Sequence, residues 1–293
     1  MNIDLVPLTM EHKKIVEEIR NRYGLDTNTG SFNACYLWKD FLDIHIVVTD
    51  DMYAIKEGTN PIDVWAFPMG ENESKKQFIK ALLSCSQPTF LKVRSNDKIF
   101  LEKEFPNVFD FKLCEDTCEY IYSGDEFAKL QGKKFRKFRE AVNNIARNHT
   151  LKTEIINSSN MDAVKTVFQK WSFHREKSGM DNTVGNETDK ILFDNFDALG
   201  LFGIITFIDA FPASVAIGYN LSTDTCDIST FKHTDAVKDL CRITLREFVL
   251  MFGNRFEFFN FEEDGGIEGL RTMKHRLNPC KINELWKATV RRE

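Results

Sequence analysis

The sequence predicts an α/β fold in which two halves of similar architecture follow one another. The length of 293 residues is enough for two domains of about 150 residues each. The composition, with 42% hydrophobic and 28% charged residues, is that of an ordinary globular protein. The strongest observation is the periodicity of apolar residues, which gives nearly the same order of strands and helices in each half.

The C-terminal half, predicted over residues 150–293, has the more clearly marked elements. Alternating apolar residues indicate strands, and apolar residues three or four positions apart indicate helices. Asp209–Pro212 and Ser222–Thr225 supply turn residues between the central strands. The expected order is strand Leu151–Asn157, helices Asn160–Ser178 and Glu187–Leu199, strands Leu201–Ile208, Ala213–Asn220 and Cys226–Phe231, helix Lys238–Phe252, strand Phe256–Phe261, helix Ile267–Arg276 and strand Ile282–Val290.

The N-terminal half, predicted over residues 1–122, repeats this architecture without visible sequence identity. Its expected elements are strand Ile3–Val6, helices Glu11–Arg22 and Ser31–Phe41, strands Ile44–Thr49, Met52–Lys56 and Ile62–Phe67, helix Ser74–Ser84, strand Thr89–Arg94, helix Lys98–Lys103 and strands Val108–Leu113 and Glu119–Tyr122. The repeated order predicts two domains of one fold.

Residues 123–149 are predicted to form a linking helical segment that packs on both halves. The whole chain carries a net charge of −5, but the helix that follows Gly132 has five cations in its first two turns. They are Lys133, Lys134, Arg136, Lys137 and Arg139. Cations at a helix start oppose the helix dipole and repel one another. We therefore expect a bound polyanion, an RNA or an anionic membrane surface, to relieve this repulsion. The alternative is a solvated basic face.

A second polar segment, residues 260–274, leaves a strand, turns on two glycines and enters a short helix. Polar groups at strand ends in α/β folds commonly bind ligands. The candidate catalytic residues are Glu262, Asp264 and, at the end of another strand, His233; the candidate substrate-binding residues are Asn260, Gly265, Arg271 and Lys274. The alternative is a turn in which Glu262 or Asp264 caps the helix.

Several function classes are excluded by missing patterns. No histidine or cysteine spacing fits a metal site, and no GxSxG, Walker or GxGxxG motif is present. Seven cysteines without a CxxC pair indicate a reduced, cytoplasmic protein. No apolar run reaches the roughly 20 residues of a transmembrane helix, and no signal peptide is expected at the start.

The order of elements resembles that of the GNAT acyltransferases. In GNAT enzymes that use acetyl-CoA, a glycine-bearing turn before the long helix binds the pyrophosphate through backbone N–H groups. The matching residues, 232–242, contain no glycine. Acetyl-CoA is therefore disfavoured as a cofactor.

Two stretches resemble the phosphatidylglycerol lysyltransferase C-terminal domain family. They are Glu119–Ser123 continuing through Leu130–Arg139, and Asn260–Pro279 with its Gly-Leu-Arg-x-x-Lys segment. Ser31–Trp38 adds a weaker match, and Glu140 stands where the family often has Asn. The resemblance implies two GNAT-like domains and transfer of an amino acid from aminoacyl-tRNA.

The predicted function is therefore acyl or aminoacyl transfer, with aminoacyl-tRNA or a similar activated amino acid as donor. Two alternatives stay open. One is a CoA-dependent N-acyltransferase with an atypical pyrophosphate loop. The other is a non-catalytic protein that binds RNA or an anionic membrane through its basic helix, and burial of both Glu262 and Asp264 beside an open basic patch would favour it.

Overall fold

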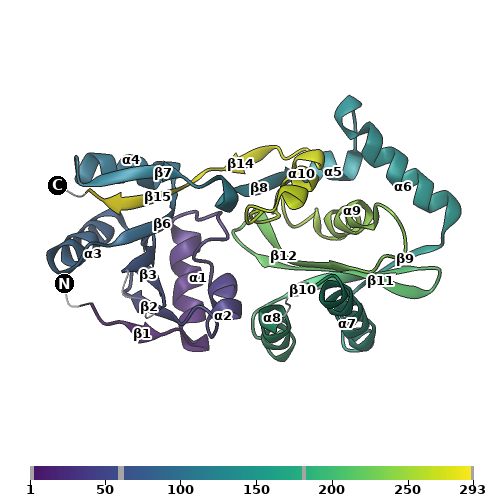
Figure 1. Cartoon of the computed structure of the whole chain (residues 1–293), viewed down its shortest axis with the longest axis horizontal. Coiled ribbons are helices and arrows are strands. Elements are labelled where there is room, and N and C mark those ends of the chain that lie inside the picture. The colour runs from purple at the N-terminus through teal and green to yellow at the C-terminus, as the bar shows by residue number, and fades with distance from the viewer. Residues whose placement is uncertain (1–2, 59–62, 180–182, 292–293) are drawn as a thin grey trace. The chain divides into compact units, whose positions relative to one another are not determined.

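A computed structural model describes residues 3–58, 63–179 and 183–291, and its fold is α/β as predicted. The chain forms two compact units. The first unit contains residues 1–120, 262–268 and 282–293, and the second contains residues 121–261 and 269–281. Each sheet belongs mainly to one unit, and helices cover it (Figure 1).

The first unit is built on a mixed sheet with the strand order β1-β2-β3-β4-β6-β15-β7, and β5 pairs with β3 beside this path. Its elements are β1 (Val6–Pro7), η1 (Met10–His12), α1 (Lys13–Arg22), α2 (Phe32–Trp38), β2 (Ile44–Val48), β3 (Met52–Glu57), β4 (Val64–Ala66), β5 (Met69–Gly70), α3 (Asn72–Cys85), β6 (Thr89–Arg94), α4 (Ser95–Glu104), β7 (Phe109–Leu113), η2 (Glu115–Thr117) and β15 (Leu285–Val290).

The core of the first unit is rich in aromatic rings. Phe67, Phe78 and Phe90 are buried at its centre, and Trp65 contacts Phe78 edge to face. Each buried aromatic side chain removes a large apolar area from water, and the cluster thereby stabilises the sheet.

The second unit has a sheet with the strand order β14-β8-β13-β12-β11-β10-β9. Its elements are β8 (Glu119–Ser123), α5 (Gly124–Lys129), η3 (Lys133–Phe135), α6 (Arg136–Asn148), β9 (Leu151–Ile155), α7 (Met161–Lys177), α8 (Thr183–Asp194), β10 (Phe202–Ile208), β11 (Phe211–Asn220), β12 (Thr225–His233), α9 (Leu240–Phe252), β13 (Phe258–Asn260), α10 (Glu268–Arg276) and β14 (Lys281–Asn283), of which β8, α10 and β14 begin or end in the first unit.

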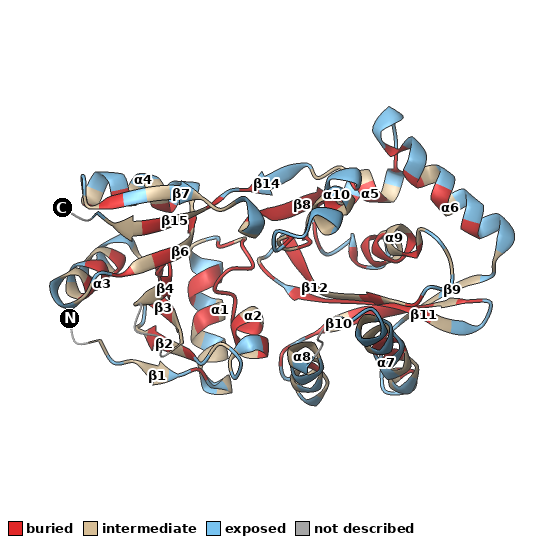
Figure 2. Cartoon of the chain, in the orientation of Figure 1, coloured by how far each residue is buried: buried red, intermediate tan, exposed pale blue. Residues whose placement is uncertain are grey.

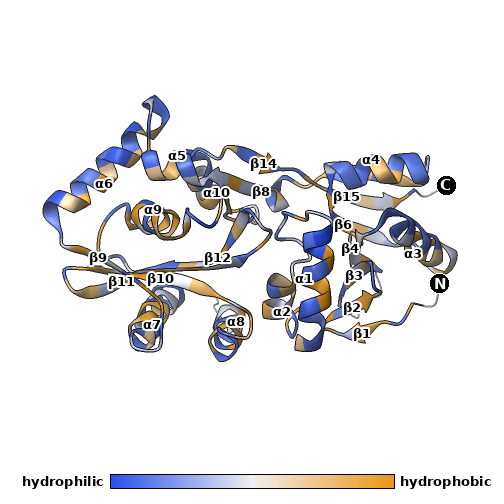
Figure 3. Ribbon diagram, turned by 180° about the vertical axis from the view of Figure 1, so that it is seen from behind, coloured by the Kyte–Doolittle hydropathy of each residue, from blue (hydrophilic) through white to orange (hydrophobic). Residues whose placement is uncertain are grey.

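The sheet of the second unit has helices on both faces. Helices α7 and α8 cover one face and α9 covers the other (Figure 1). Figure 2 shows α9 largely buried, and Figure 3 shows it mostly hydrophobic beside a mostly hydrophilic α6. The apolar side chains of α9, such as Ile243 and Phe248, occupy the core, as expected for a helix packed against a sheet.

Two predicted strands pair differently from the expectation. The strand expected to close the N-terminal half, β8, pairs with β13, so that Asn260 lies opposite Ile121. The strand expected to close the C-terminal half, Ile282–Val290, contains β15, and β15 lies between β6 and β7 of the first sheet. Leu285 and Ala288 are fully buried there. Periodicity identifies a strand but carries no information about its partners, which explains the difference.

The basic segment, residues 123–149, belongs to the second unit. Phe127 lies at the centre of its packing. The Phe127 ring contacts the rings of Tyr122, Phe138 and Phe261 at centroid distances of 5.3, 5.4 and 5.8 Å. These aromatic contacts fix α5 and α6 against their own unit.

Candidate functional site

In a buried loop of the first unit, residues 25–30, one arginine bonds several backbone carbonyls. Arg20 on α1 is only 3% exposed, and its guanidinium donates hydrogen bonds to the carbonyls of Leu25, Thr27 and Thr29. It also donates to the hydroxyl of Tyr53. Burying a loop normally leaves backbone carbonyls without partners, and one guanidinium with five donors supplies several of them at once.

The backbone N–H groups of the same loop are bonded to Glu119. The Glu119 carboxylate is buried and accepts from the backbone N–H groups of Asn28 and Thr29 at 3.1 and 3.2 Å, and from the Thr29 hydroxyl. Held on both sides, the loop directs the Asn28 amide to Glu262 Oε1 at 2.9 Å. Asn28 therefore fixes the position of the Glu262 carboxylate.

Asp264 lies two residues further along and is fully buried. Its carboxylate accepts a hydrogen bond of 2.6 Å from the Tyr120 hydroxyl and one of 2.9 Å from the backbone N–H of Gly266. Gly266 has φ +75°, and an added Cβ would lie 3.1 Å from the carboxyl group of Asp116. The Asp264 carboxylate thus organises the glycine turn from inside.

Lys92 on β6 places a positive charge among the carboxylates. Burial alone lowers the pKa of its ammonium, but the carboxylates of Glu263, Glu119 and Glu57 outweigh this effect and leave the pKa raised. Lys92 and Glu262 both have left-handed backbone conformations, with φ of +54° and +57°. Such conformations in residues other than glycine are strained and concentrate at functional sites.

These residues form what we call the carboxylate cluster: Asn28, Lys92, Glu119, Tyr120, Glu262, Glu263 and Asp264. The cluster holds four carboxylates and one ammonium on the first unit. Glu262 and Glu263 are half-buried and therefore in reach of solvent, whereas Glu119 and Asp264 are buried. An excess of carboxylates, two of them accessible, suits the binding and deprotonation of an amine.

The other predicted site residues lie in the second unit, apart from Gly265. Asn260 is buried and stands in register with buried Asp227 on the neighbouring strand β12. Lys274 is buried on α10 and donates to the carbonyl of Phe261, while Arg271 is half-buried. Gly265 belongs to the first unit and is exposed, and its N–H donates to the carbonyl of Asp116.

His233, the third candidate catalytic residue, ends β12 in the second unit. It is half-buried, and its Nδ1 lies 3.0 Å from the carbonyl oxygen of Thr234. His233 therefore belongs to a different unit from Glu262 and Asp264.

The five basic residues near the start of α6 differ in their surroundings. Lys134 pairs with Glu126 at 2.7 Å, and Arg139 donates to the carbonyls of Leu130 and Gly132. The remaining three, Lys133, Arg136 and Lys137, are exposed, and Arg136 approaches Glu140 at 3.7 Å. Arg139 thus ties down the backbone that precedes the helix, and the other three cations face solvent.

Sequence reasoning missed part of the carboxylate cluster. Asn28 and Lys92 lie in segments that carry no motif, and Glu119 and Tyr120 lie in a stretch noted only for its resemblance. Glu119 is a charged residue at the start of an otherwise apolar strand. A buried charge requires a bonding partner, and this is the signal that could have pointed to Glu119. Nothing in the sequence indicates that residue 28 faces residue 262.

Two kinds of site find no support in the described ranges. There, His, Cys, Asp and Glu side chains nowhere gather in a group of three or more suited to a metal ion. None of the helices in these ranges combines the length and apolar character needed to cross a membrane.

The fold defines the class to which the chain belongs. The chain consists of two GNAT-like halves, and each half has a sheet covered by helices. Within this class, the chain belongs to the family described as phosphatidylglycerol lysyltransferase, C-terminal, whose model matches residues 20–289.

Solved structures share this fold over nearly the whole chain. A conserved protein of unknown function from Bacteroides thetaiotaomicron VPI-5482 is 22% identical, with a TM-score of 0.90 and coverage of 99% of this chain and 100% of its own. L-PGS from Bacillus licheniformis is 14% identical, with a TM-score of 0.68 and coverage of 99% and 94%. FemX is 11% identical, with a TM-score of 0.61 and coverage of 99% and 98%. No curated protein matches the sequence.

Proposed function

We propose that this protein is an acyltransferase that takes an amino acid from aminoacyl-tRNA, or from a similar activated amino acid. The observation that carries the proposal is the carboxylate cluster, in which a loop bonded to Arg20 and Glu119 directs Asn28 to the half-buried carboxylate of Glu262. Membership of the lysyltransferase family and the fold shared with L-PGS and FemX support the same chemistry.

The proposed reaction is attack of an amine or hydroxyl on the ester carbonyl of the donor. A new bond forms between the attacking nitrogen or oxygen and the carbonyl carbon, and the bond from that carbon to the tRNA ribose oxygen breaks. The proton of the attacking group passes to the Glu262 carboxylate and from there to the leaving ribose oxygen. Asp264 acts as a positioning residue that holds the glycine turn next to Glu262.

The basic face of α6 supplies the contact with the polyanionic donor in this proposal. Lys133, Arg136 and Lys137 are exposed, and an RNA backbone offers phosphates to such cations.

The test is incubation of the protein with a labelled charged-tRNA pool, in the presence of anionic phospholipid vesicles or of free amines. We expect acceptor-dependent loss of label from tRNA, and a reduction of about 100-fold or more in Glu262→Gln, because a general base contributes about that factor. The matched control is Glu268→Gln, an exposed carboxylate six residues away. Absence of transfer from every charged tRNA would overturn the proposal.

A second function is favoured by one observation. Asp264 is fully buried and bonded while the cations of α6 are exposed, as expected for a protein that only binds a polyanion. Glu262, however, is only half-buried. Salt-sensitive binding of tRNA or anionic vesicles without any transfer would establish this second function in place of the first.

A further inference from the structure

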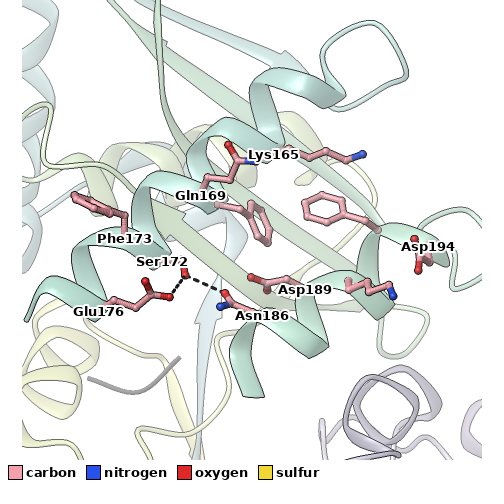
Figure 4. Close-up of a pocket in the computed structure, with 11 residues that line it drawn as sticks. Lys165, Gln169, Ser172, Phe173, Glu176, Asn186, Asp189 and Asp194 are labelled. Carbon is pink, nitrogen blue, oxygen red and sulfur yellow. Dashed lines mark hydrogen bonds between the residues drawn. The ribbon is translucent and has the colours of Figure 1, made fainter. Parts of the chain in front are cut away.

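A groove between α7 and α8 is distinct from the carboxylate cluster and belongs wholly to the second unit (Figure 4). Its volume is about 520 Å³, which lies within the range of small-molecule sites. The residues that line it recur along α7 at helical spacing from Lys165 to Glu176, and along α8 from Asn186 to Asp194. The two helices therefore present one continuous surface to it.

The groove is lined by aromatic rings. Phe168 and Phe193 contact each other with a centroid distance of 4.8 Å, and Phe173 is 63% exposed at one side. An exposed phenylalanine beside a hollow that already contains two rings forms an apolar surface of the kind that binds ligands.

A buried ion pair lies beside these rings. Lys232 reaches from β12 to Asp189 on α8, and its ammonium lies 4.3 Å from the ring centroid of Phe168 and 4.5 Å from that of Trp171. The Lys232 side chain is 7% exposed and the Asp189 side chain 17%, so that the carboxylate is the member of the pair that lines the groove. Burial raises the pKa of Asp189 and lowers that of Lys232.

The two ends of the groove differ in polarity. At one end the Ser172 hydroxyl lies 2.9 Å from Asn186 Oδ1 and 3.3 Å from Glu176 Oε1, which makes this end rich in acceptors (Figure 4). The rest of the lining carries both signs of charge, with Lys165, Lys190 and Asp194, and the Lys165 ammonium lies 5.6 Å from the ring centroid of Phe193. An ammonium group is the complement of the first end, because it brings three donors and a positive charge.

We propose that this groove binds an amphipathic amine. Its apolar body lies on the rings of Phe168, Phe173 and Phe193, and its ammonium lies at the acceptor end beside Glu176. Asp189 is already paired with Lys232, so the Glu176 carboxylate supplies the negative charge that attracts the ammonium. The inference does not depend on the proposed transfer reaction, since none of these residues belongs to the carboxylate cluster.

The test uses three probes of one shape: hexylammonium, hexanol and hexanoate, titrated into the full chain by calorimetry. We expect hexylammonium to bind more tightly than hexanol, and hexanoate to bind most weakly. Glu176→Gln lowers the affinity for hexylammonium by about fivefold, as expected for a partly exposed charge pair. The same variant leaves the affinity for hexanol unchanged. Phe173→Ala lowers the affinities for both hexylammonium and hexanol.

Two controls keep the result interpretable. Glu187→Gln removes an exposed carboxylate of α8 that does not line the groove, and it leaves all three affinities unchanged. Thermal melts check that the exposed positions Glu176 and Phe173 tolerate substitution. Equal or tighter binding of hexanoate, absence of saturable binding of hexylammonium, or an unchanged hexylammonium affinity in Glu176→Gln would each overturn the proposal.

Discussion

The carboxylate cluster of the first unit and the basic face of α6 in the second unit concentrate charge in opposite ways. In the cluster, Glu119 and Asp264 are buried, and each accepts hydrogen bonds from backbone N–H groups and from a hydroxyl. Around the start of α6, Lys133 of η3 and Arg136 and Lys137 of α6 are exposed to solvent. The cluster buries two of its carboxylates inside the fold, and the cations near the start of α6 stay outside.

The difference teaches that charge density alone does not define a site. A buried charge must be fully bonded, and its removal costs folding free energy, because its partners lose their bonds. An exposed charge costs little to remove and acts through the ligand that it attracts. Stability and binding measurements therefore separate the two regions.

The largest effect is expected at Arg20, which the cluster depends on. Arg20→Leu leaves the carbonyls of Leu25, Thr27 and Thr29 without this donor, and we expect a loss of about 3 kcal/mol or more in the free energy of unfolding, measured in urea. Arg22→Leu on the same helix changes an exposed side chain and serves as control, with an expected change within about 0.5 kcal/mol. Similar losses in the two variants would contradict the role given to Arg20.

A smaller loss is expected when Asp264 loses one donor. Tyr120→Phe removes the hydroxyl that lies 2.6 Å from the buried carboxylate, and we expect a loss of about 1–3 kcal/mol by chemical denaturation. Tyr36→Phe is the control, since Tyr36 is half-buried and no hydrogen bond of its hydroxyl is described. A stability equal to that of the wild type would show that Asp264 does not rely on Tyr120.

The sequence predicts most of the fold, but only two of the seven residues of the carboxylate cluster, Glu262 and Asp264, as site residues. Periodicity located α9 and α10 to within about two residues, because their apolar faces repeat regularly. The same method could not assign β15 to the first sheet, since pairing is a long-range property. Glu262 and Asp264 were found from glycine turn chemistry, but their different burial depends on Asn28 and Tyr120, which are distant in sequence.

The basic face should respond through binding and not through stability. Replacing Lys133, Arg136 and Lys137 by Gln should lower the slope of log affinity for tRNA against log salt by about 2–3, if each cation contacts one phosphate. The free energy of unfolding should stay within about 0.5 kcal/mol of the wild type. Arg139 is left in place because it bonds the carbonyls of Leu130 and Gly132.

The matched control for the basic face replaces three exposed lysines of the first unit, Lys80, Lys103 and Lys112, by Gln. It changes the net charge equally and should leave the salt slope unchanged. An equal fall of the slope in both triple variants would mean that tRNA senses only the overall charge.

The central claim is that two carboxylates, two positions apart in one loop, have different roles: Asp264 holds the turn and Glu262 is available for chemistry. The most direct measurement compares the unfolding free energies of Asp264→Asn and Glu262→Gln in urea, because both variants exchange a carboxylate for an amide of the same shape. We expect a loss of about 1–3 kcal/mol for Asp264→Asn and a change within about 0.5 kcal/mol for Glu262→Gln. Equal losses, or a larger loss for Glu262→Gln, would contradict the account.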